Sequence, residues 1–69
     1  MKSLARNIWY LRKSKNWTQK QLAMKIGTKC AKISFWELGK KVPEDKIIIK
    51  LSKLFEVPKE KLKKEVIWK

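Results

Sequence analysis

Apolar residues recur at helical spacing near the start of the chain, which predicts a first helix there. Ser3 is a candidate N-cap of this helix, because a serine hydroxyl can accept a hydrogen bond from a free backbone amide of the first turn. The helix is predicted to end near Ser14. Its buried face is expected to consist of Leu4, Ala5, Ile8 and Leu11.

A second helical pattern begins after Thr18, at the start of a motif that spans about residues 18–37. Thr18 and Gln21 form the T-x-x-Q pattern of a capping box, in which each side chain accepts a hydrogen bond from the backbone amide of the other residue. Gly27 is expected to end the helix, since glycine adopts a positive φ without steric cost. The face directed at the core consists of Leu22, Ala23 and Ile26.

A third helical pattern follows the turn after Gly27 and covers about residues 29–37. One face carries Ile33 and Trp36, with Glu37 beside them, and is expected to lie against the core. The other face carries Cys30, Ala31, Lys32, Ser34 and Phe35. Two helices joined by a short turn that contains glycine form a helix-turn-helix, whose second helix can enter the major groove of DNA.

A fourth helix is predicted to begin just after the loop at residues 40–42. Pro43, Glu44 and Asp45 mark the start of this helix, and the two acids are favourable near the positive end of the helix dipole. The helix is expected to run to about Phe55. Its core face consists of Ile47, Ile48, Leu51, Leu54 and Phe55, with Ile49 outside that face.

A fifth helix is predicted from Lys59 to about Trp68. Its apolar side carries Leu62, Val66 and Ile67. The chain is therefore predicted to be all-α, a compact bundle of five short helices that forms a single domain over residues 1–69. A domain of this size buries only about 60% of the surface that its unfolded chain exposes, so we expect marginal stability.

The motif at residues 18–37 resembles the helix-turn-helix of the phage repressor and Cro family. The matching residues are Thr18, Gln19, Leu22, Ala23, Ile26, Gly27, Ile33, Ser34, Trp36, Glu37 and Gly39. Outside the motif, the matches are Ile8, Leu11, Arg12, Pro43 and the run from Leu51 to Val57. The resemblance covers roughly residues 4–62. It implies a lambda-repressor-like DNA-binding domain whose third helix, at about residues 29–37, enters the major groove.

The resemblance also implies roles for individual residues. Arg12 and Glu37 are expected to form a structural ion pair that ties the first helix to the third. Phosphate contacts are expected from Gln19, Lys29, Lys40 and Lys41, and base contacts from Cys30, Ala31, Lys32, Ser34 and Phe35. Because Cys30, Ala31 and Phe35 offer no amide or guanidinium, two alternatives stay open: readout through thymine methyl groups and DNA shape, or weak specificity.

The formal net charge is +13, and it is unevenly distributed. Residues 1–36 contain nine Lys and Arg residues and no acidic residue, whereas residues 37–69 contain ten basic and six acidic residues. Such a field attracts polyanions and accelerates their encounter with the protein. A solubilising lysine-rich surface would explain the abundance of lysine but not the absence of acids from the first half, so a nucleic-acid surface is favoured.

The composition argues against several other classes of protein. One cysteine, Cys30, and no histidine leave too few ligands for a structural zinc site, and neither a metal nor a cofactor is expected. We interpret Cys30 as a small groove-facing side chain rather than a redox sensor. No apolar run approaches the ~20 residues of a membrane span, and the start lacks a secretory apolar block, so a cytoplasmic, nucleoid-associated protein is expected. Catalysis is not expected, because histidine and a glycine-rich phosphate loop are both absent.

The expected function is sequence-specific binding of double-stranded DNA by a small transcriptional regulator that acts as a repressor. The family usually binds as symmetric dimers, with recognition helices one DNA turn, about 34 Å, apart. A homodimer is therefore an open expectation, in which the segment Val66–Trp68 either forms the dimer surface or packs on the first helix. The alternative function is a protein-interaction adaptor, coactivator or antitoxin-like, with weak DNA binding. A membrane partner is disfavoured by the capped helices and the several separate apolar faces, and no small-molecule ligand is evident.

Overall fold

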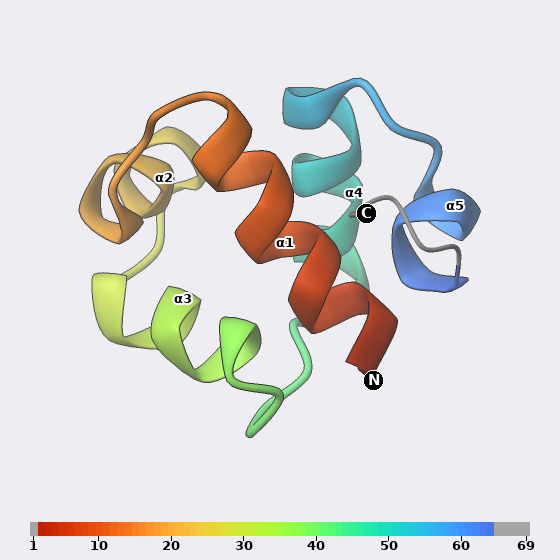
Figure 1. Cartoon of the computed structure of the whole chain (residues 1–69), viewed down its shortest axis with the longest axis horizontal. Helices are drawn as coiled ribbons and strands as arrows, with labels where there is room; N and C mark the ends of the chain where they lie inside the picture. Colours follow the sequence, from red (N-terminus) through yellow and green to blue (C-terminus); the bar gives the residue numbers. More distant parts are fainter. Residues whose placement is uncertain (1, 65–69) are drawn as a thin grey trace.

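The computed structural model describes residues 2–64, which form five helices and no strand (Figure 1). The helices are α1 (Lys2–Ser14), α2 (Gln19–Ile26), α3 (Cys30–Glu37), α4 (Asp45–Phe55) and α5 (Lys59–Lys64). They fold into a body of 25 × 23 × 21 Å, so the expected all-α bundle is confirmed. Within this part of the chain, no helix has the length and apolar character needed to cross a membrane.

Two helix boundaries need comment. Ser3 lies inside α1, which begins at Lys2, so the prediction that Ser3 caps the helix from outside is wrong. The described part of α5 ends at Lys64, and the expected continuation of this helix, with the segment Val66–Trp68, lies outside the described residues.

The core lies where all five helices converge. Figure 1 shows α1 crossing the middle of the molecule, with α2 and α3 on one side of it and α4 and α5 on the other. Each helix contributes at least one fully buried side chain: Leu4 and Ile8 from α1, Leu22 from α2, Ile33 from α3, Leu51 from α4 and Leu62 from α5. The helical spacing of the apolar residues therefore predicted the core-facing sides correctly.

The start and end of α2 follow from local interactions. Thr18 Oγ1 accepts a hydrogen bond from the Gln21 amide at 3.0 Å, and the Thr18 amide donates to Gln21 Oε1 at 2.8 Å, which completes the predicted capping box. At the other end, Gly27 has φ 72° and its amide donates to the Ala23 carbonyl. The left-handed conformation at Gly27 ends α2 and directs the chain into α3.

Sequence analysis missed one buried polar residue, Asn7. Its side chain is fully buried, and its Nδ2 donates a hydrogen bond to the Leu62 carbonyl at 2.8 Å, which links α1 to α5. The position of Asn7, three residues after Leu4 and four before Leu11, places it on the buried face of α1. That spacing was the available signal, because a polar residue on a buried face requires a hydrogen-bond partner.

Candidate nucleic-acid interface

The inner side of α3 is fixed by a bidentate ion pair between Arg12 of α1 and Glu37 of α3. Arg12 Nε donates to Glu37 Oε2 at 2.6 Å, and Arg12 Nη2 donates to Glu37 Oε1 at 3.0 Å. The two side chains are only 7% and 5% exposed, so the pair is shielded from water. Arg12 Nη1 also donates to the Trp17 carbonyl at 2.7 Å, which ties the segment before α2 to the same guanidinium. One arginine thus sets the relative positions of α1, α2 and α3.

Gln19, the first residue of α2, is also part of the hydrogen-bond network around Glu37. Its Nε2 donates to Glu37 Oε1 at 3.0 Å, and the residue is half-buried. The side chain expected to contact phosphate is therefore turned toward α3 in the free protein. At the start of α2, the first-turn backbone amides are the groups that favour binding of an anion.

The residues expected to contact bases lie outside the core. Ile33 and Trp36 are the buried residues of α3, in agreement with the predicted core-facing side. The other residues of interest, Cys30, Ala31, Lys32 and Phe35, are exposed, and Ser34 is half-buried. The third helix therefore presents most of its outer surface to solvent while its inner surface is held by the core and by Arg12.

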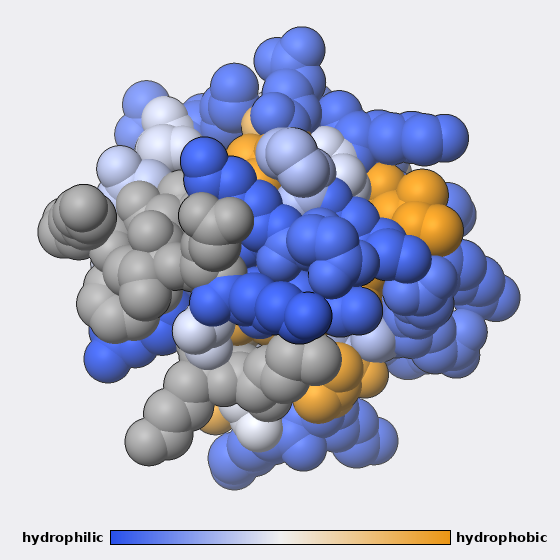
Figure 2. All heavy atoms as spheres, turned by 90° about the vertical axis from the view of Figure 1, so that its right-hand side faces the viewer, coloured by the Kyte–Doolittle hydropathy of each residue, from blue (hydrophilic) through white to orange (hydrophobic). Residues whose placement is uncertain are grey.

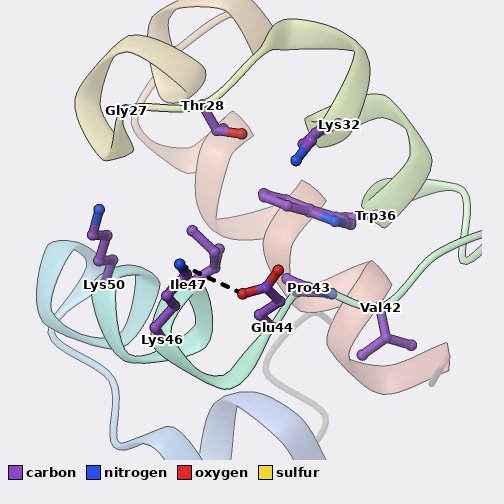
Figure 3. A pocket seen from close by; sticks show the side chains of 10 residues that line it. All are labelled: Gly27, Thr28, Lys32, Trp36, Val42, Pro43, Glu44, Lys46, Ile47 and Lys50. Carbon is purple, nitrogen blue, oxygen red and sulfur yellow. Dashed lines mark ion pairs between the residues drawn. The ribbon is translucent and has the colours of Figure 1, made fainter.

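Two of these residues lie on the flanks of α3 rather than at the centre of its outer surface. Lys32 lines a pocket of about 330 Å³ toward α4, together with Thr28, Trp36 and Lys50 (Figure 3). Cys30 lines a separate hollow beside the start of α2, whose other lining residues include Gln19. The structure thus leaves Ala31 and Phe35, with Ser34 beside them, at the centre.

The pocket between α3 and α4 contains both signs of charge. In Figure 3, Lys32 and Trp36 approach from α3, while Lys46 and Lys50 approach from α4. Glu44 forms an exposed ion pair with Lys46 at 3.7 Å, and Lys50 Nζ donates to the Ile26 carbonyl at 3.4 Å. Two of the three lysines therefore already have partners within the protein.

Lysines lie before and after α3. Lys29 is the N-cap residue of the helix, and it is exposed. Lys40 and Lys41 follow the helix, and their amides donate to the Phe35 carbonyl at 3.0 and 3.4 Å, which holds this loop close to the end of α3. The Lys41 ammonium lies 5.5 Å from the centroid of the Phe35 ring, within the range of a cation–π contact. These three lysines therefore surround the exposed surface of α3.

Sequence analysis assigned no role to Leu38, which continues the exposed apolar surface. Leu38 is 65% exposed, and its φ of −82° and ψ of −7° extend the helical conformation beyond Glu37. Ala31, Phe35 and Leu38 are spaced i, i+4 and i+7, so they share one side of the helix. This i, i+4, i+7 spacing is present in the sequence and was the available signal for Leu38.

The described residues offer no metal site. Among residues 2–64, no group of three His, Cys, Asp or Glu side chains could hold a metal ion.

Comparison with known proteins agrees with this geometry. The helix-turn-helix family model of the Cro and phage-repressor type matches residues 10–62, and the chain belongs to this family. It is therefore a DNA-binding, transcription-regulating helix-turn-helix protein. No curated protein and no solved structure matches the chain.

Proposed function

We propose that this protein is a repressor that binds double-stranded DNA sequence-specifically by inserting α3 into the major groove. The observation that carries the proposal is the division of α3 into two sides. The inner side is fixed by Ile33, Trp36 and the buried Arg12–Glu37 pair, and the outer side is exposed and surrounded by lysines. A helix held rigidly with one free surface meets the requirement for docking into a groove.

The proposed contacts divide into positioning and reading contacts. Lys29, Lys40 and Lys41 supply cations to the phosphates on either side of the groove, and Gln19 contributes at the start of α2 together with the first-turn amides. Base edges are met by Ala31, Ser34 and Phe35 at the centre of the outer surface, with Cys30 and Lys32 at its flanks.

The long-range field of the protein favours this ligand. Residues 1–36 contain nine basic residues and no acidic residue, and the first acid, Glu37, is buried against Arg12. The outward surface of α1, α2 and α3 therefore repels no phosphate. A duplex is attracted before any specific contact forms.

We expect repression to result from occupancy of the operator by the protein. A protein bound across an operator blocks access of the polymerase to the same DNA. Two copies bound as a symmetric dimer would place their α3 helices about 34 Å apart, on successive turns of the same face of the duplex. The oligomeric state on DNA is measured by sedimentation of the complex with a selected duplex.

The salt dependence of binding tests the proposal. Affinity for a duplex selected from random DNA is measured across salt concentrations, and neutralisation of about six phosphates gives a log–log slope near −5. Lys40→Gln and Lys41→Gln should each make the slope shallower by about 0.9. Lys61→Gln, at an exposed position on α5, is the matched control and should leave the slope unchanged.

A second candidate function, the protein-interaction adaptor, is favoured by one observation. Phe35, Leu38 and Val42 are large apolar residues that are exposed close together in the sequence. In this case a cooperatively folded protein would bind duplexes weakly, and selection from random DNA would enrich no motif. That outcome would replace the repressor proposal by the adaptor.

A further inference from the structure

We propose that α3 reads its operator mainly through the C5-methyl groups of thymine, and this inference rests on the proposed binding of DNA by α3. The reading surface is an apolar stripe, defined here as Ala31, Phe35 and Leu38.

The apolar stripe runs along the centre of the outer surface of α3. Phe35 is 39% exposed and Leu38 is 65% exposed, and Ala31 is also exposed. Leu38 keeps helical backbone angles, so the i, i+4, i+7 alignment of the three residues is maintained to the end of the stripe. An apolar surface at the centre of a helix that enters a groove would remove water from the donors and acceptors of the bases opposite it without giving them hydrogen bonds, so apolar groups are its favourable partners there.

Polar readout is not available from the same stripe. The segment from Cys30 to Leu38 contains no Asn, Gln or Arg, and Lys32 is its one residue of the types that make bidentate hydrogen bonds to purines. Ser34 is half-buried, and Lys32 is turned to the pocket beside α4. Hydrogen bonds to base edges can therefore come only from the margins of the surface.

The major groove offers one apolar group to such a stripe. Of the four bases, thymine alone carries a methyl group on its major-groove edge, and the other groups there are hydrogen-bond donors and acceptors. The Lys41 ammonium lies 5.5 Å from the centroid of the Phe35 ring, and this cation–π contact restricts the ring before DNA is bound. A ring held in place before binding loses little conformational freedom on contact.

The charge around the stripe favours DNA over an apolar protein surface. Lys29, Lys32, Lys40 and Lys41 all lie within or beside α3 and are exposed. The carboxylate nearest to the stripe in the sequence, Glu37, is buried on the opposite side and neutralised by Arg12. A ligand that is apolar at its centre and anionic along both margins matches a thymine-rich major groove between two phosphate backbones.

The test compares duplexes that differ only in methyl groups. Affinity is measured for a duplex of alternating A·T pairs and for its counterpart in which deoxyuridine replaces thymidine. A second pair consists of alternating G·C duplexes with cytosine or 5-methylcytosine. The wild-type protein should prefer the methylated member of each pair by about fourfold for every methyl group contacted.

Variants of the apolar stripe test whether its side chains cause the preference for methylated duplexes. Phe35→Ala should reduce the preference for thymidine over deoxyuridine toward one, Leu38→Ala should reduce it partly, and Phe35→Leu should retain part of it. Ile49→Ala is the matched control, because Ile49 on α4 is 38% exposed and Phe35 is 39% exposed. Cooperative melting of each variant is checked first. Any change in DNA shape caused by deoxyuridine would affect the wild type and Phe35→Ala equally, so the difference between them reports the contact.

The possible outcomes separate this inference from the function on which it rests. Tight, salt-dependent binding that is indifferent to the methyl groups overturns thymine readout and leaves DNA binding intact. A methyl preference that persists in Phe35→Ala also overturns it. Absence of binding to all four duplexes removes the proposed function itself and favours the adaptor.

Discussion

Residues 1–43 and residues 44–64 use acidic residues in opposite ways. In the first, Glu37 is the one acidic residue, and its side chain is 5% exposed in a bidentate pair with Arg12. In the second, Glu44, Asp45 and Glu60 form ion pairs with lysines at 3.3–3.7 Å, and these carboxylates are 61–74% exposed. An ion pair is therefore buried between α1 and α3 in the first region, whereas the ion pairs of the second region lie on the surface, where water screens them.

The difference has a consequence for the surface that each region shows. Because the acid of the first region is buried, the solvent side of α1, α2 and α3 is cationic without interruption by carboxylates. On the second region, carboxylates alternate with lysines. Figure 2, viewed from the side of α5 in Figure 1, shows a mostly hydrophilic face with apolar atoms in separate small patches. Because the carboxylate of Glu37 is buried against Arg12, the exterior of α1, α2 and α3 suits a polyanion.

The largest expected effect comes from Glu37→Ala, which leaves the buried Arg12 guanidinium without its carboxylate. Removal of one member of a buried pair costs about 3–5 kcal/mol. In a domain of this size that corresponds to a fall in Tm of more than about 10 °C, which thermal melting followed by circular dichroism measures. Gln19 also loses its acceptor in this variant.

Two controls sharpen that result. Glu44→Ala removes an exposed carboxylate whose partner, Lys46, is also exposed, and should change stability by less than about 1 kcal/mol. The double variant Arg12→Leu/Glu37→Leu removes both buried charges and should be more stable than Glu37→Ala alone. If Glu37→Ala melts at the wild-type temperature, the contrast between the two regions does not hold.

The features predicted best from sequence depend on neighbours in the chain. The capping box of Thr18 and Gln21 and the turn at Gly27 need only local spacing, and both are present as predicted. The core-facing sides of the helices follow from periodicity in the same way. The Arg12–Glu37 contact, in contrast, was an expectation from family resemblance, because its members are 25 residues apart.

The candidate site was harder to predict because it depends on which helix lies beside each flank of α3. Periodicity put Cys30 and Lys32 on the exposed side with Phe35, and only the packed structure shows that one faces the start of α2 and the other faces α4. Gln19 is predicted to contact phosphate, and the structure shows that Glu37 also gives its side-chain amide an acceptor within the protein. Periodicity cannot report such contacts, because side-chain direction at a helix junction is set by partners distant in sequence.

An intermediate effect is expected at the C-caps of α2, in the first region, and of α4, in the second, which adopt the left-handed conformation with different residues. Gly27 ends α2 with φ 72°, whereas Glu56 ends α4 with φ 57°. Nothing lies within 4 Å of a Cβ built on Gly27, so Gly27→Ala adds backbone strain without a clash. We expect a loss of about 1 kcal/mol.

The reverse change on α4 completes this comparison. Glu56→Gly relieves the left-handed strain of a residue with a side chain and should raise stability by up to about 1 kcal/mol. Urea unfolding measures both variants. Equal stability of wild type and Gly27→Ala would mean that the turn between α2 and α3 does not depend on glycine, and would remove one distinction between the two regions.

The smallest effect is expected from Lys64→Ala on α5. Lys64 and Glu60 are paired at 3.7 Å in the i, i+4 arrangement, and both side chains are well exposed. Such a pair contributes at most about 0.5 kcal/mol, and added salt screens it. Unfolding at low and high salt should therefore show the loss in Lys64→Ala shrinking with salt, while the loss in Glu37→Ala persists because water and ions do not reach the buried pair. A loss above about 1 kcal/mol for Lys64→Ala would show that an exposed pair within one helix of the second region also contributes strongly to stability, since exposed pairs rarely reach that value.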